Sequence, residues 1–380
     1  MTTTDKSHTL FRAAFRDFVA REMTPHFDDW ERAGIMERSV YAAAGAHGFV
    51  GFNLPESHGG GGADDFWFNT IVNEELQYAG MGGAGNGITL ANDILAPYFT
   101  GLCNDDQRDR WLPGLAAGTL IPAVAMTEPG TGSDLASIAT RAERDGDEYV
   151  VNGAKTFITN GINSDVVVTV VRTDPDAGRH GLSLLVLERG MPGFERGRNL
   201  DKIGQKSADT AELFFTDVRV PVTNRLGEEG EAMTYLTDNL PQERLSLAIG
   251  GVAVAQAALD WTVDYVKERH AFGSRIADFQ NTKFVLAECE TELAVARPYI
   301  ADCVDRLNAG TFSAADAAKA KLWATELQGR VTDKCLQLFG GYGFMTEYPI
   351  SLAYADARVA RIYGGTSEIM KTIIAKDVLG

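Results

Sequence analysis

The run Val166–Val171 (VVVTVV) sets the architecture of this chain, because it is a β-branched stretch between two regions of helical character. β-Branched side chains favour extended backbone, and an apolar run of this length is typical of a buried strand. Comparable runs lie at 148–153, 182–187 and 210–215. Short strands at this spacing, separated by turn residues and not by helices, predict an antiparallel β-barrel or sandwich over residues 122–230.

Helical periodicity precedes and follows this β region. In residues 1–121, apolar side chains such as Phe15, Phe18 and Leu76 belong to patterns that recur every three to four positions, which is the period of an α-helix. Residues 231–380 contain longer segments of helical character at 247–267, 283–307 and 314–339. The sequence therefore predicts an α+β chain of three domains, with boundaries at 1–121, 122–230 and 231–380.

Composition and charge are those of an acidic globular protein. The 380 residues are 45% hydrophobic and carry a formal net charge of -17, which argues against non-specific binding to nucleic acid because such binding needs basic patches. The four scattered cysteines lack metal-ligand spacing, so we interpret them as reduced thiols and expect no metal site. The N-terminus lacks the apolar core of a signal peptide, and no uninterrupted apolar run has membrane-spanning length. We expect a cytoplasmic protein without membrane insertion.

The segment Ala125–Asp134 (AMTEPGTGSD) opens the β region with glycines, hydroxyls and a proline. Glycine lets backbone approach a flat ring or a phosphate closely, and Thr127 and Ser133 can form hydrogen bonds. A plain polar loop is the commoner interpretation of such a composition. Further segments of comparable character follow in order: Gly153–Gly161 (GAKTFITNG), Arg269–Gly273 (RHAFG) with Phe279-Gln280, Gln337–Gly343 (QLFGGYG), and Tyr363–Ile369 (YGGTSEI).

These five ordered segments resemble the flavin-binding and C-terminal signatures of the acyl-CoA dehydrogenases, above all those of the long-chain and isovaleryl type. The resemblance implies an N-terminal all-α domain, a middle β domain and a C-terminal four-helix bundle. It implies FAD as the cofactor, an acyl-CoA thioester as the substrate and a role in fatty acid β-oxidation. It also implies an electron-transferring flavoprotein as electron acceptor and a homo-oligomer, which in this family is usually a tetramer.

The resemblance assigns flavin contacts to each segment. Met126 and Thr127 would offer backbone amides and a hydroxyl to the polar edge of the ring. Phe157 would pack beside the ring, where many relatives carry Trp, and Thr159 would reach the N5 side. Arg269 would pair with the pyrophosphate. The other flavin contacts implied are Ser133, Ile158, Phe272, Gln280, Gln337, Leu338, Gly340, Gly341, Thr366 and Glu368. In the family, the segments around Arg269 and Gln337 contact the flavin of a neighbouring subunit.

These residues also have structural interpretations. Arg269 is by default a surface charge, and Phe272 on its own is more often a core residue. Gly340-Gly341 is by default a helix C-cap, and Glu368 fits the first turn of a helix capped by Thr366. We assign Glu368 a binding or capping role. Gly250-Gly251 either makes room for the acyl chain or lets helices pack closely.

Gly364 stands where many members of the family carry the glutamate that acts as catalytic base. Glycine has no side chain to take a proton, so either the enzyme is inactive or the base lies elsewhere. In long-chain and isovaleryl members the base lies at the position that matches Glu243. We interpret Glu243 as the proton acceptor and the Gly364 N–H as a donor to the thioester carbonyl. The resemblance adds Ser133, Arg244, Tyr363 and Gly365 as contacts of the acyl-CoA.

Glu243 has a structural alternative as an acid in the first turn of a helix that begins near Pro241. Pro241 is also compatible with a kink inside a longer helix. If Glu243 is buried beside an acyl chain, we expect its pKa to be raised. The leading prediction is FAD-dependent α,β-dehydrogenation of an acyl-CoA to the trans-2-enoyl-CoA, with hydride transfer to flavin N5. The alternatives are an acyl-CoA oxidase that uses oxygen and an inactive flavin- or CoA-binding homologue. The sequence does not specify the acyl group.

Overall fold

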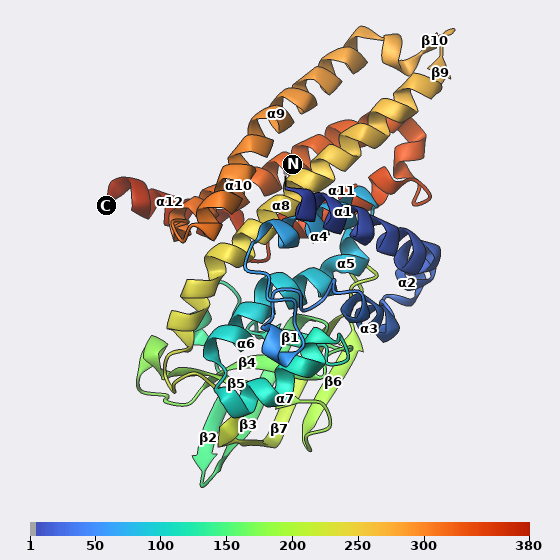
Figure 1. Ribbon diagram of the computed structural model, residues 1–380. Coiled ribbons are helices and arrows are strands. Elements are labelled where there is room, and N and C mark those ends of the chain that lie inside the picture. Colours follow the sequence, from blue (N-terminus) through green and yellow to red (C-terminus); the bar gives the residue numbers. More distant parts are fainter. Residues whose placement is uncertain (1–4) are drawn as a thin grey trace.

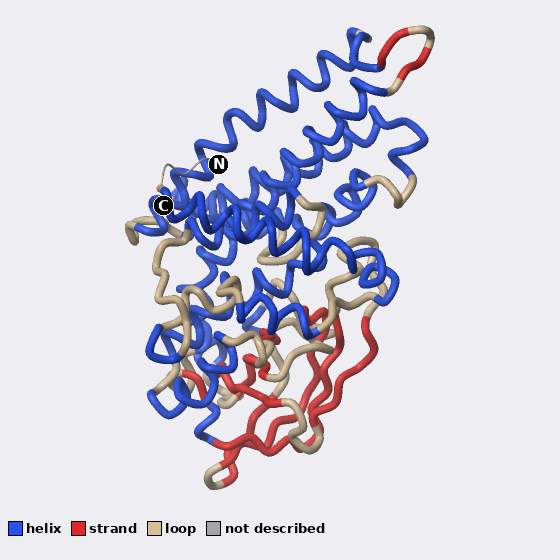
Figure 2. The backbone as a smooth tube through the Cα atoms, turned by 45° about the vertical axis from the view of Figure 1, so that its right-hand side comes forward, coloured by secondary structure: helices blue, strands red, loops and turns tan. Residues whose placement is uncertain are grey.

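The computed structural model describes residues 5–380, which form three parts arranged along one long axis (Figure 1). The sheet lies at the lower end, the N-terminal helices lie in the middle, and long C-terminal helices reach the upper end. Figure 2 shows the same order from another side. Helix α8 (Ala232–Glu268) runs from the sheet to the upper tip and connects these parts.

The N-terminal part is helical, as predicted. Its helices are α1 (Lys6–Phe18), α2 (Phe27–Ala33), α3 (Arg38–Ala46), α4 (Trp67–Tyr78), α5 (Gly82–Thr89), α6 (Ala96–Leu102) and α7 (Asp105–Ala116). A π-helical segment, Leu90–Leu95, joins α5 to α6. Buried aromatic side chains such as Phe15 and Phe18 fill the core of this part, so the apolar periodicity predicted the helix faces correctly.

The predicted β runs are confirmed as strands of one sheet, which is eight-stranded in the described residues. The strands are β1 (Pro122–Ala125), β2 (Arg141–Asp145), β3 (Glu148–Thr159), β4 (Val166–Arg172), β5 (Leu182–Glu188), β6 (Phe194–Asn199), β7 (Thr210–Pro221) and β8 (Arg225–Leu226). The run VVVTVV forms β4, where each of its side chains is buried. Pairing is mostly antiparallel, but β1 and β2 each pair with β4 in parallel, which the antiparallel prediction missed.

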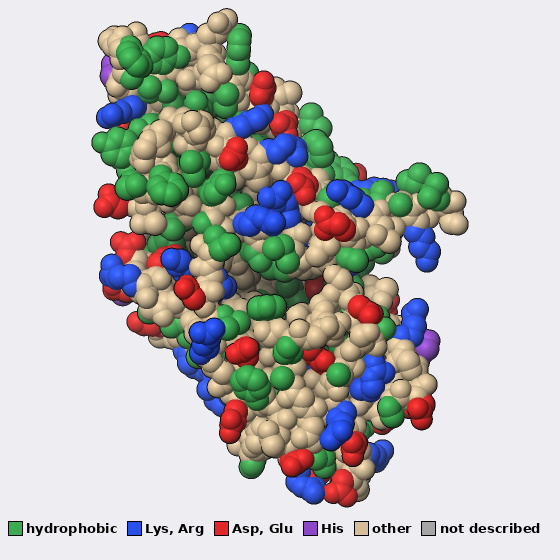
Figure 3. All heavy atoms as spheres, turned by 180° about the vertical axis from the view of Figure 1, so that it is seen from behind, with side chains coloured by type: hydrophobic (Ala, Val, Ile, Leu, Met, Phe, Trp, Pro, Cys, Tyr) green, Lys and Arg blue, Asp and Glu red, His purple; other side chains and the backbone are tan. Residues whose placement is uncertain are grey.

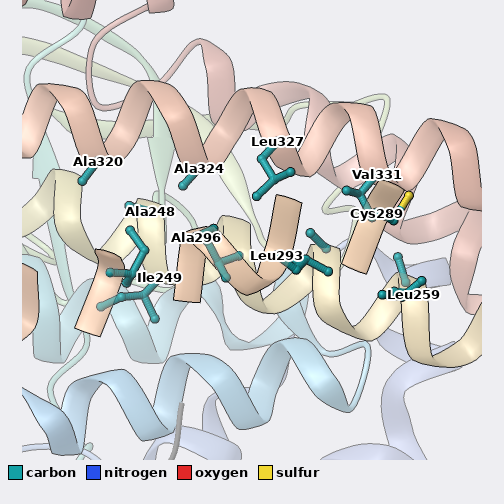
Figure 4. Packing of buried hydrophobic residues seen from close by; sticks show 14 of the residues in the cluster. Ala248, Ile249, Leu259, Cys289, Leu293, Ala296, Ala320, Ala324, Leu327 and Val331 are labelled. Atoms are coloured by element: carbon teal, nitrogen blue, oxygen red, sulfur yellow. The ribbon is translucent and has the colours of Figure 1, made fainter. Parts of the chain in front are cut away.

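The C-terminal part consists of the long helices α8, α9 (Gln280–Asn308) and α10 (Ala314–Phe339), with the shorter α11 (Pro349–Ala357) and α12 (Ser367–Leu379). The short strands β9 (His270–Ala271) and β10 (Ser274–Arg275) form the tip. Figure 4 shows Ala320, Ala324 and Leu327 of α10 beside Ala248 and Ile249 of α8, and these side chains belong to one buried cluster. Small residues therefore let α8 and α10 approach closely.

Gly250 and Gly251 take part in this helix packing. A β-carbon on Gly251 would lie 3.1 Å from the Ala324 carbonyl oxygen of α10. A β-carbon on Gly250 would lie 3.0 Å from Oδ1 of Asn73, on α4. Of the two interpretations given to this glycine pair, the structure supports close packing of helices.

Helix α8 also corrects one expectation. It begins at Ala232 and contains Pro241 in its interior, so Glu243 is not in a first turn and the structural alternative for Glu243 is wrong. By length and composition alone, α8 is long and apolar enough to cross a membrane. Within the protein, most of its apolar stretch is buried, as is typical of the core helix of a bundle.

Candidate active site

Glu243 lies on an inward face of α8 and is only 6% exposed. Its Oε1 accepts a hydrogen bond of 3.0 Å from the hydroxyl of Tyr98, which is on α6. Burial raises the pKa of the Glu243 carboxyl to about 7, against the opposing effects of the Tyr98 hydrogen bond and the positive charge of Arg244. A carboxyl with this pKa can be deprotonated near neutrality and is still basic enough to accept a proton.

The same face of α8 packs against the turn of residues 363–366, which precedes α12. Leu247 lies one helical turn beyond Glu243 and so shares its face. A β-carbon built on Gly364 would lie 2.4 Å from Leu247 Cδ1. Gly364 also has a φ of +63°, a conformation that strains most residues with a side chain. The structure thus brings Glu243 and Gly364 together, and a glutamate at position 364 would require Leu247 to move.

Buried cations hold the backbone carbonyls of the 363–366 turn. Arg244 Nε donates to the Gly364 oxygen at 3.2 Å, and Lys321 Nζ on α10 donates to the Gly365 oxygen at 2.7 Å. Within residues 5–380, the backbone N–H groups at 364, 365 and 366 donate to no protein acceptor. The turn therefore presents free donors of the kind that polarise a thioester carbonyl.

The loop of residues 126–134, between β1 and β2, is anchored by a buried ion pair. Lys155 on β3 has no exposed surface, and its Nζ contacts Glu128 Oε1 at 2.8 Å and the Met126 carbonyl oxygen at 3.0 Å. Glu128 also accepts hydrogen bonds from the backbone N–H groups of Ala139 and Thr140. These hydrogen bonds and the ammonium of Lys155 hold the pKa of the Glu128 carboxyl below its usual value, although burial opposes them. The predicted contact residues Met126 and Thr127 are thus fixed from behind.

Phe157 projects from β3 as an exposed aromatic side chain. It is 68% exposed and has a φ of +60°. The pairing of β3 with β7 shifts register between Lys155 and Ile158, and such a bulge re-aims side chains. A strained backbone that presents an apolar ring to solvent is typical of a binding site. This placement agrees with the predicted role of Phe157 beside a flat ring, whereas Ile158 is buried in the sheet.

A groove of about 740 Å³ at the upper tip collects other predicted contact residues. Its lining includes Arg269, Phe272, Gln337, Leu338, Gly340 and Gly341. The guanidinium of Arg269 lies 5.2 Å from the ring centre of Tyr342, and Phe272 is 98% exposed. The interpretation of Phe272 as a core residue is therefore wrong. At about 1.5 Å rise per residue, Arg269 lies roughly 39 Å along α8 from Glu243.

The remaining predicted residues have defined places. Ser133 is exposed in the 126–134 loop, Thr159 is half-buried at the end of β3, and Gln280 is exposed at the start of α9. Thr366 caps α12 by accepting a hydrogen bond from the Ile369 N–H at 3.3 Å, so the predicted cap is confirmed.

Glu368 is exposed in the first turn of α12. Backbone and Thr366 hydrogen bonds lower the pKa of its carboxyl, which makes it a poor proton acceptor. Burial raises the pKa of the half-buried Tyr363.

Sequence reasoning missed Tyr98, Glu128, Lys155 and Lys321, which support the site from behind. A signal was present for Lys321, because it occupies the buried stripe of α10 together with Ala317, Ala324 and Val331. Charged residues on an apolar helix face are uncommon unless they are paired. Tyr98 gave no such signal, because its link to Glu243 spans 145 positions of sequence.

Comparison with known proteins places each part of the chain in one family. The model of the N-terminal domain of acyl-CoA dehydrogenases matches residues 5–119, that of the middle domain matches 123–218, and that of the C-terminal domain matches 230–379. These matches cover nearly the whole chain in order.

Individual relatives agree with the family models. The chain is 45% identical to the mitochondrial long-chain specific acyl-CoA dehydrogenase of Sus scrofa over 98% of this chain and 86% of that protein. It is 47% identical to an acyl-CoA dehydrogenase from Geobacillus kaustophilus, whose crystal structure superposes with a TM-score of 0.96 over 98% of both chains. It is also similar to a chain in a structure described as the electron transferring flavoprotein of Acidaminococcus fermentans, with 32% identity and a TM-score of 0.95 over 100% of this chain and 99% of that one.

Proposed function

The chain belongs to the acyl-CoA dehydrogenase family, whose members are FAD-dependent oxidoreductases, and from this premise we propose that Glu243 is its catalytic base. The substrate would be a long-chain acyl-CoA, as the similarity to the long-chain specific enzyme of Sus scrofa suggests. The observation that carries the proposal is the buried Glu243 carboxyl on the helix face that packs against Gly364. A possible base, Glu243, is therefore present on α8, opposite the position in the 363–366 turn where Gly364 lacks a side chain.

The residues present fit FAD. Phe157 and Phe272 offer exposed aromatic faces, both from left-handed backbone, and a flavin ring would cover such surfaces. The Thr127 N–H donates to no protein acceptor within the described chain, so it is free for a polar ring edge. Arg269 supplies a cation for a pyrophosphate. When bound, FAD supplies the acceptor for the hydride that leaves the β-carbon of the substrate.

The chain's own residues would polarise the thioester and remove the α-proton, so that the hydride can leave the β-carbon. The free N–H of Gly364 would donate to the thioester carbonyl oxygen and so stabilise negative charge there. That polarisation acidifies the α-carbon, and the deprotonated Glu243 would take the α-proton into its carboxylate. Arg244 would fix the turn through the Gly364 carbonyl, in addition to its predicted contact with the acyl-CoA. Tyr98 would hold the Glu243 carboxylate in position.

We further propose a homo-oligomer, a tetramer by family expectation. Large apolar side chains are exposed on the helices of the C-terminal part, including Phe284 and Val295 on α9 and Val378 and Leu379 on α12. Figure 3 shows hydrophobic side chains along this part and at the protruding end of α12. Extended apolar surface of this kind marks interfaces. Because Arg269 lies far from Glu243, its groove would serve the flavin of a neighbouring subunit.

An electron-transferring flavoprotein is the proposed acceptor of the electrons. The support is the family resemblance together with the similarity to a chain in the structure described for such a flavoprotein of Acidaminococcus fermentans. Turnover with that acceptor and slow turnover in air would support the proposal. Stoichiometric peroxide formation in air, with no added acceptor, would point to an oxidase instead.

The base assignment is tested by Glu243→Gln in the FAD-loaded enzyme. Glutamine keeps the size of the side chain but cannot accept the proton, so we expect anaerobic bleaching of the flavin by a long-chain acyl-CoA to slow by about 10²–10⁴-fold. Binding of the acyl-CoA should persist. The matched control is Glu231→Gln, the same change at the exposed residue before α8, which should bleach at the wild-type rate. Undiminished bleaching in Glu243→Gln would contradict the assignment, and a wild-type protein that binds acyl-CoA without bleaching would indicate an inactive homologue.

A further inference from the structure

Lys321 is a buried cation that the proposed reaction does not use directly. It lies on α10 with no exposed surface, and its Nζ donates to the Gly365 carbonyl oxygen at 2.7 Å. Within residues 5–380, no carboxylate lies within ion-pair distance of this ammonium, while Glu326 and Glu368 act on it only from further away. Burying an unpaired charge is costly, and an apolar residue of similar volume would pack at this position at lower cost. Such a residue calls for a functional explanation.

The contact of Lys321 complements that of Arg244. Arg244 holds the carbonyl of Gly364 from α8, and Lys321 holds the next carbonyl, that of Gly365, from α10. Both glycines have left-handed φ values, +63° and +95°. Two consecutive glycines have wide conformational freedom, so without external contacts this turn would sample many states. The two cations restrict it to one.

The direction of the free N–H groups follows from this restraint. In a trans peptide the C=O and the N–H point in opposite directions. Lys321 fixes the Gly365 carbonyl and thereby the plane that carries the Thr366 N–H, and Arg244 fixes the plane that carries the Gly365 N–H. The Gly364 N–H belongs to the peptide group just before the two peptide groups that Arg244 and Lys321 restrain. Its direction therefore depends on how firmly these cations hold the turn.

We propose that Lys321 is a positioning residue for the polarisation of the thioester, acting through the Gly365 carbonyl to hold the 363–366 turn so that its N–H groups face the substrate. The proposal rests on the proposed function, in which the Gly364 N–H donates to the thioester oxygen. Lys321 does not touch the substrate in this arrangement. Its positive charge adds to that of Arg244 behind the turn, and both favour negative charge on the substrate oxygen.

The test is Lys321→Met in the FAD-loaded enzyme, read by infrared spectroscopy of a bound ligand. The probe is a redox-inert acyl-CoA analogue with sulfur at position 3 and ¹³C at the carbonyl carbon. The red shift of its carbonyl stretch on binding measures polarisation directly. We expect Lys321→Met to lose at least half of this shift and to reduce flavin bleaching by a long-chain acyl-CoA about tenfold, mainly through the rate at saturation and not through KM.

The matched control is Lys319→Met, the same substitution on the same helix. Lys319 pairs with Asp377 at 2.9 Å on the surface, and its loss should leave the red shift unchanged. If Lys321→Met fails to fold or to retain FAD, Lys321→Gln replaces it, because glutamine keeps an N–H donor without the charge and should give an intermediate shift. A wild-type red shift in whichever variant folds would overturn the proposal.

The outcomes separate this inference from the base assignment. Glu243→Gln should keep the red shift while strongly slowing bleaching, because it removes the proton acceptor and leaves the turn intact. If Glu243→Gln bleaches normally, the base assignment fails whatever Lys321 does. If Glu243→Gln behaves as expected and Lys321→Met keeps the full shift, only the positioning role of Lys321 fails.

Discussion

Two segments of the candidate site, the 126–134 loop and the 363–366 turn, are held by buried lysines in different ways. Each segment is called a wall of the site below. In the sheet, Lys155 reaches the Met126 carbonyl of the 126–134 loop and is paired with Glu128. In the helical bundle, Lys321 reaches the Gly365 carbonyl of the 363–366 turn without a carboxylate at ion-pair distance in the described residues. Burial lowers the pKa of both ammonium groups to about 8. One wall is thus fixed by a neutralised pair and the other by a bare cation.

Under the proposed function, this difference suits the two segments to different tasks, one to binding a ring and the other to stabilising charge. A neutralised pair fixes the 126–134 loop with little net field, which suits a surface for a flat ring. A bare cation fixes the 363–366 turn and also contributes a positive potential where the substrate oxygen would become negative. The two lysines should therefore differ in what their removal does to stability, because only Lys155 leaves a buried carboxylate behind.

The largest expected effect is that of Lys155→Met on stability. The substitution leaves Glu128, which is only 8% exposed, without its cation, and breaking a buried pair in this way costs about 3–5 kcal/mol. We expect the free energy of unfolding in urea to fall by this amount and FAD to bind more weakly. Lys321→Met should cost far less, since no carboxylate loses its partner.

The double variant Lys155→Met/Glu128→Gln separates the stranded charge from lost packing. Removing the carboxylate as well should recover more than half of the stability that Lys155→Met loses. If the double variant is as unstable as Lys155→Met alone, the buried charge is not the cause. The contrast between the two walls would then rest on packing and not on pairing.

The second effect is the pH dependence of stability that Lys321 confers. Its folded-state pKa of about 8 lies below the ordinary value of 10.5. Between these values the unfolded chain binds a proton that the folded chain does not, so the free energy of unfolding should rise with pH across this window, by up to about 3 kcal/mol. Below pH 8 both states bind the proton and the contribution is flat. The reason is that the folded protein tolerates neutral Lys321 better than the charged form.

Urea unfolding of the wild type and of Lys321→Met, measured from pH 7 to pH 10.5, checks this dependence. The stability difference should shift in favour of the wild type as pH rises, because the Met variant has nothing to deprotonate. Lys319→Met is again the control and should follow the wild-type curve, since Lys319 is only half-buried and is paired with Asp377. If the free energies of unfolding of wild type and Lys321→Met change in parallel with pH, the pKa of Lys321 is not lowered in the folded protein.

The helices and strands that carry the site were predictable where the local sequence pattern determines the secondary structure. The helix predicted at 314–339 is α10 with the same bounds, because its apolar stripe and its Ser313 cap lie within one segment. The run VVVTVV predicted β4 because a strand buried on both faces needs no alternation. Glu243 and Gly364 were paired by family resemblance, and the packing of Leu247 against Gly364 gives that pairing a physical basis.

The supports of the site could not be predicted, because they join distant segments. Lys155 and Glu128 are 27 positions apart, and Lys321 and Gly365 are 44 apart. Neither local periodicity nor turn chemistry carries information at such separations. Pro241 left two options open, a helix start and a position inside a longer helix, because a proline near a helical pattern often marks a boundary; the structure has the second. Packing of α8 against α4 and α10 overrides that preference.

The smallest effect expected is that of Tyr98→Phe, which removes the hydrogen bond that the Tyr98 hydroxyl on α6 donates to the Glu243 carboxylate on α8. The Tyr98 hydroxyl stabilises the ionised form of Glu243 and so lowers its pKa. Without it the pKa should rise by about one unit, given that a hydrogen bond to a charged group contributes about 1.5 kcal/mol or more. Flavin bleaching by a long-chain acyl-CoA should then slow about five- to tenfold near pH 7 and recover at higher pH.

The matched control is Tyr149→Phe, which removes a tyrosine hydrogen bond of 2.8 Å to Glu229 and should leave the pH profile of bleaching unchanged. A uniform loss of rate in Tyr98→Phe at every pH would mean that Tyr98 places the carboxylate without tuning it.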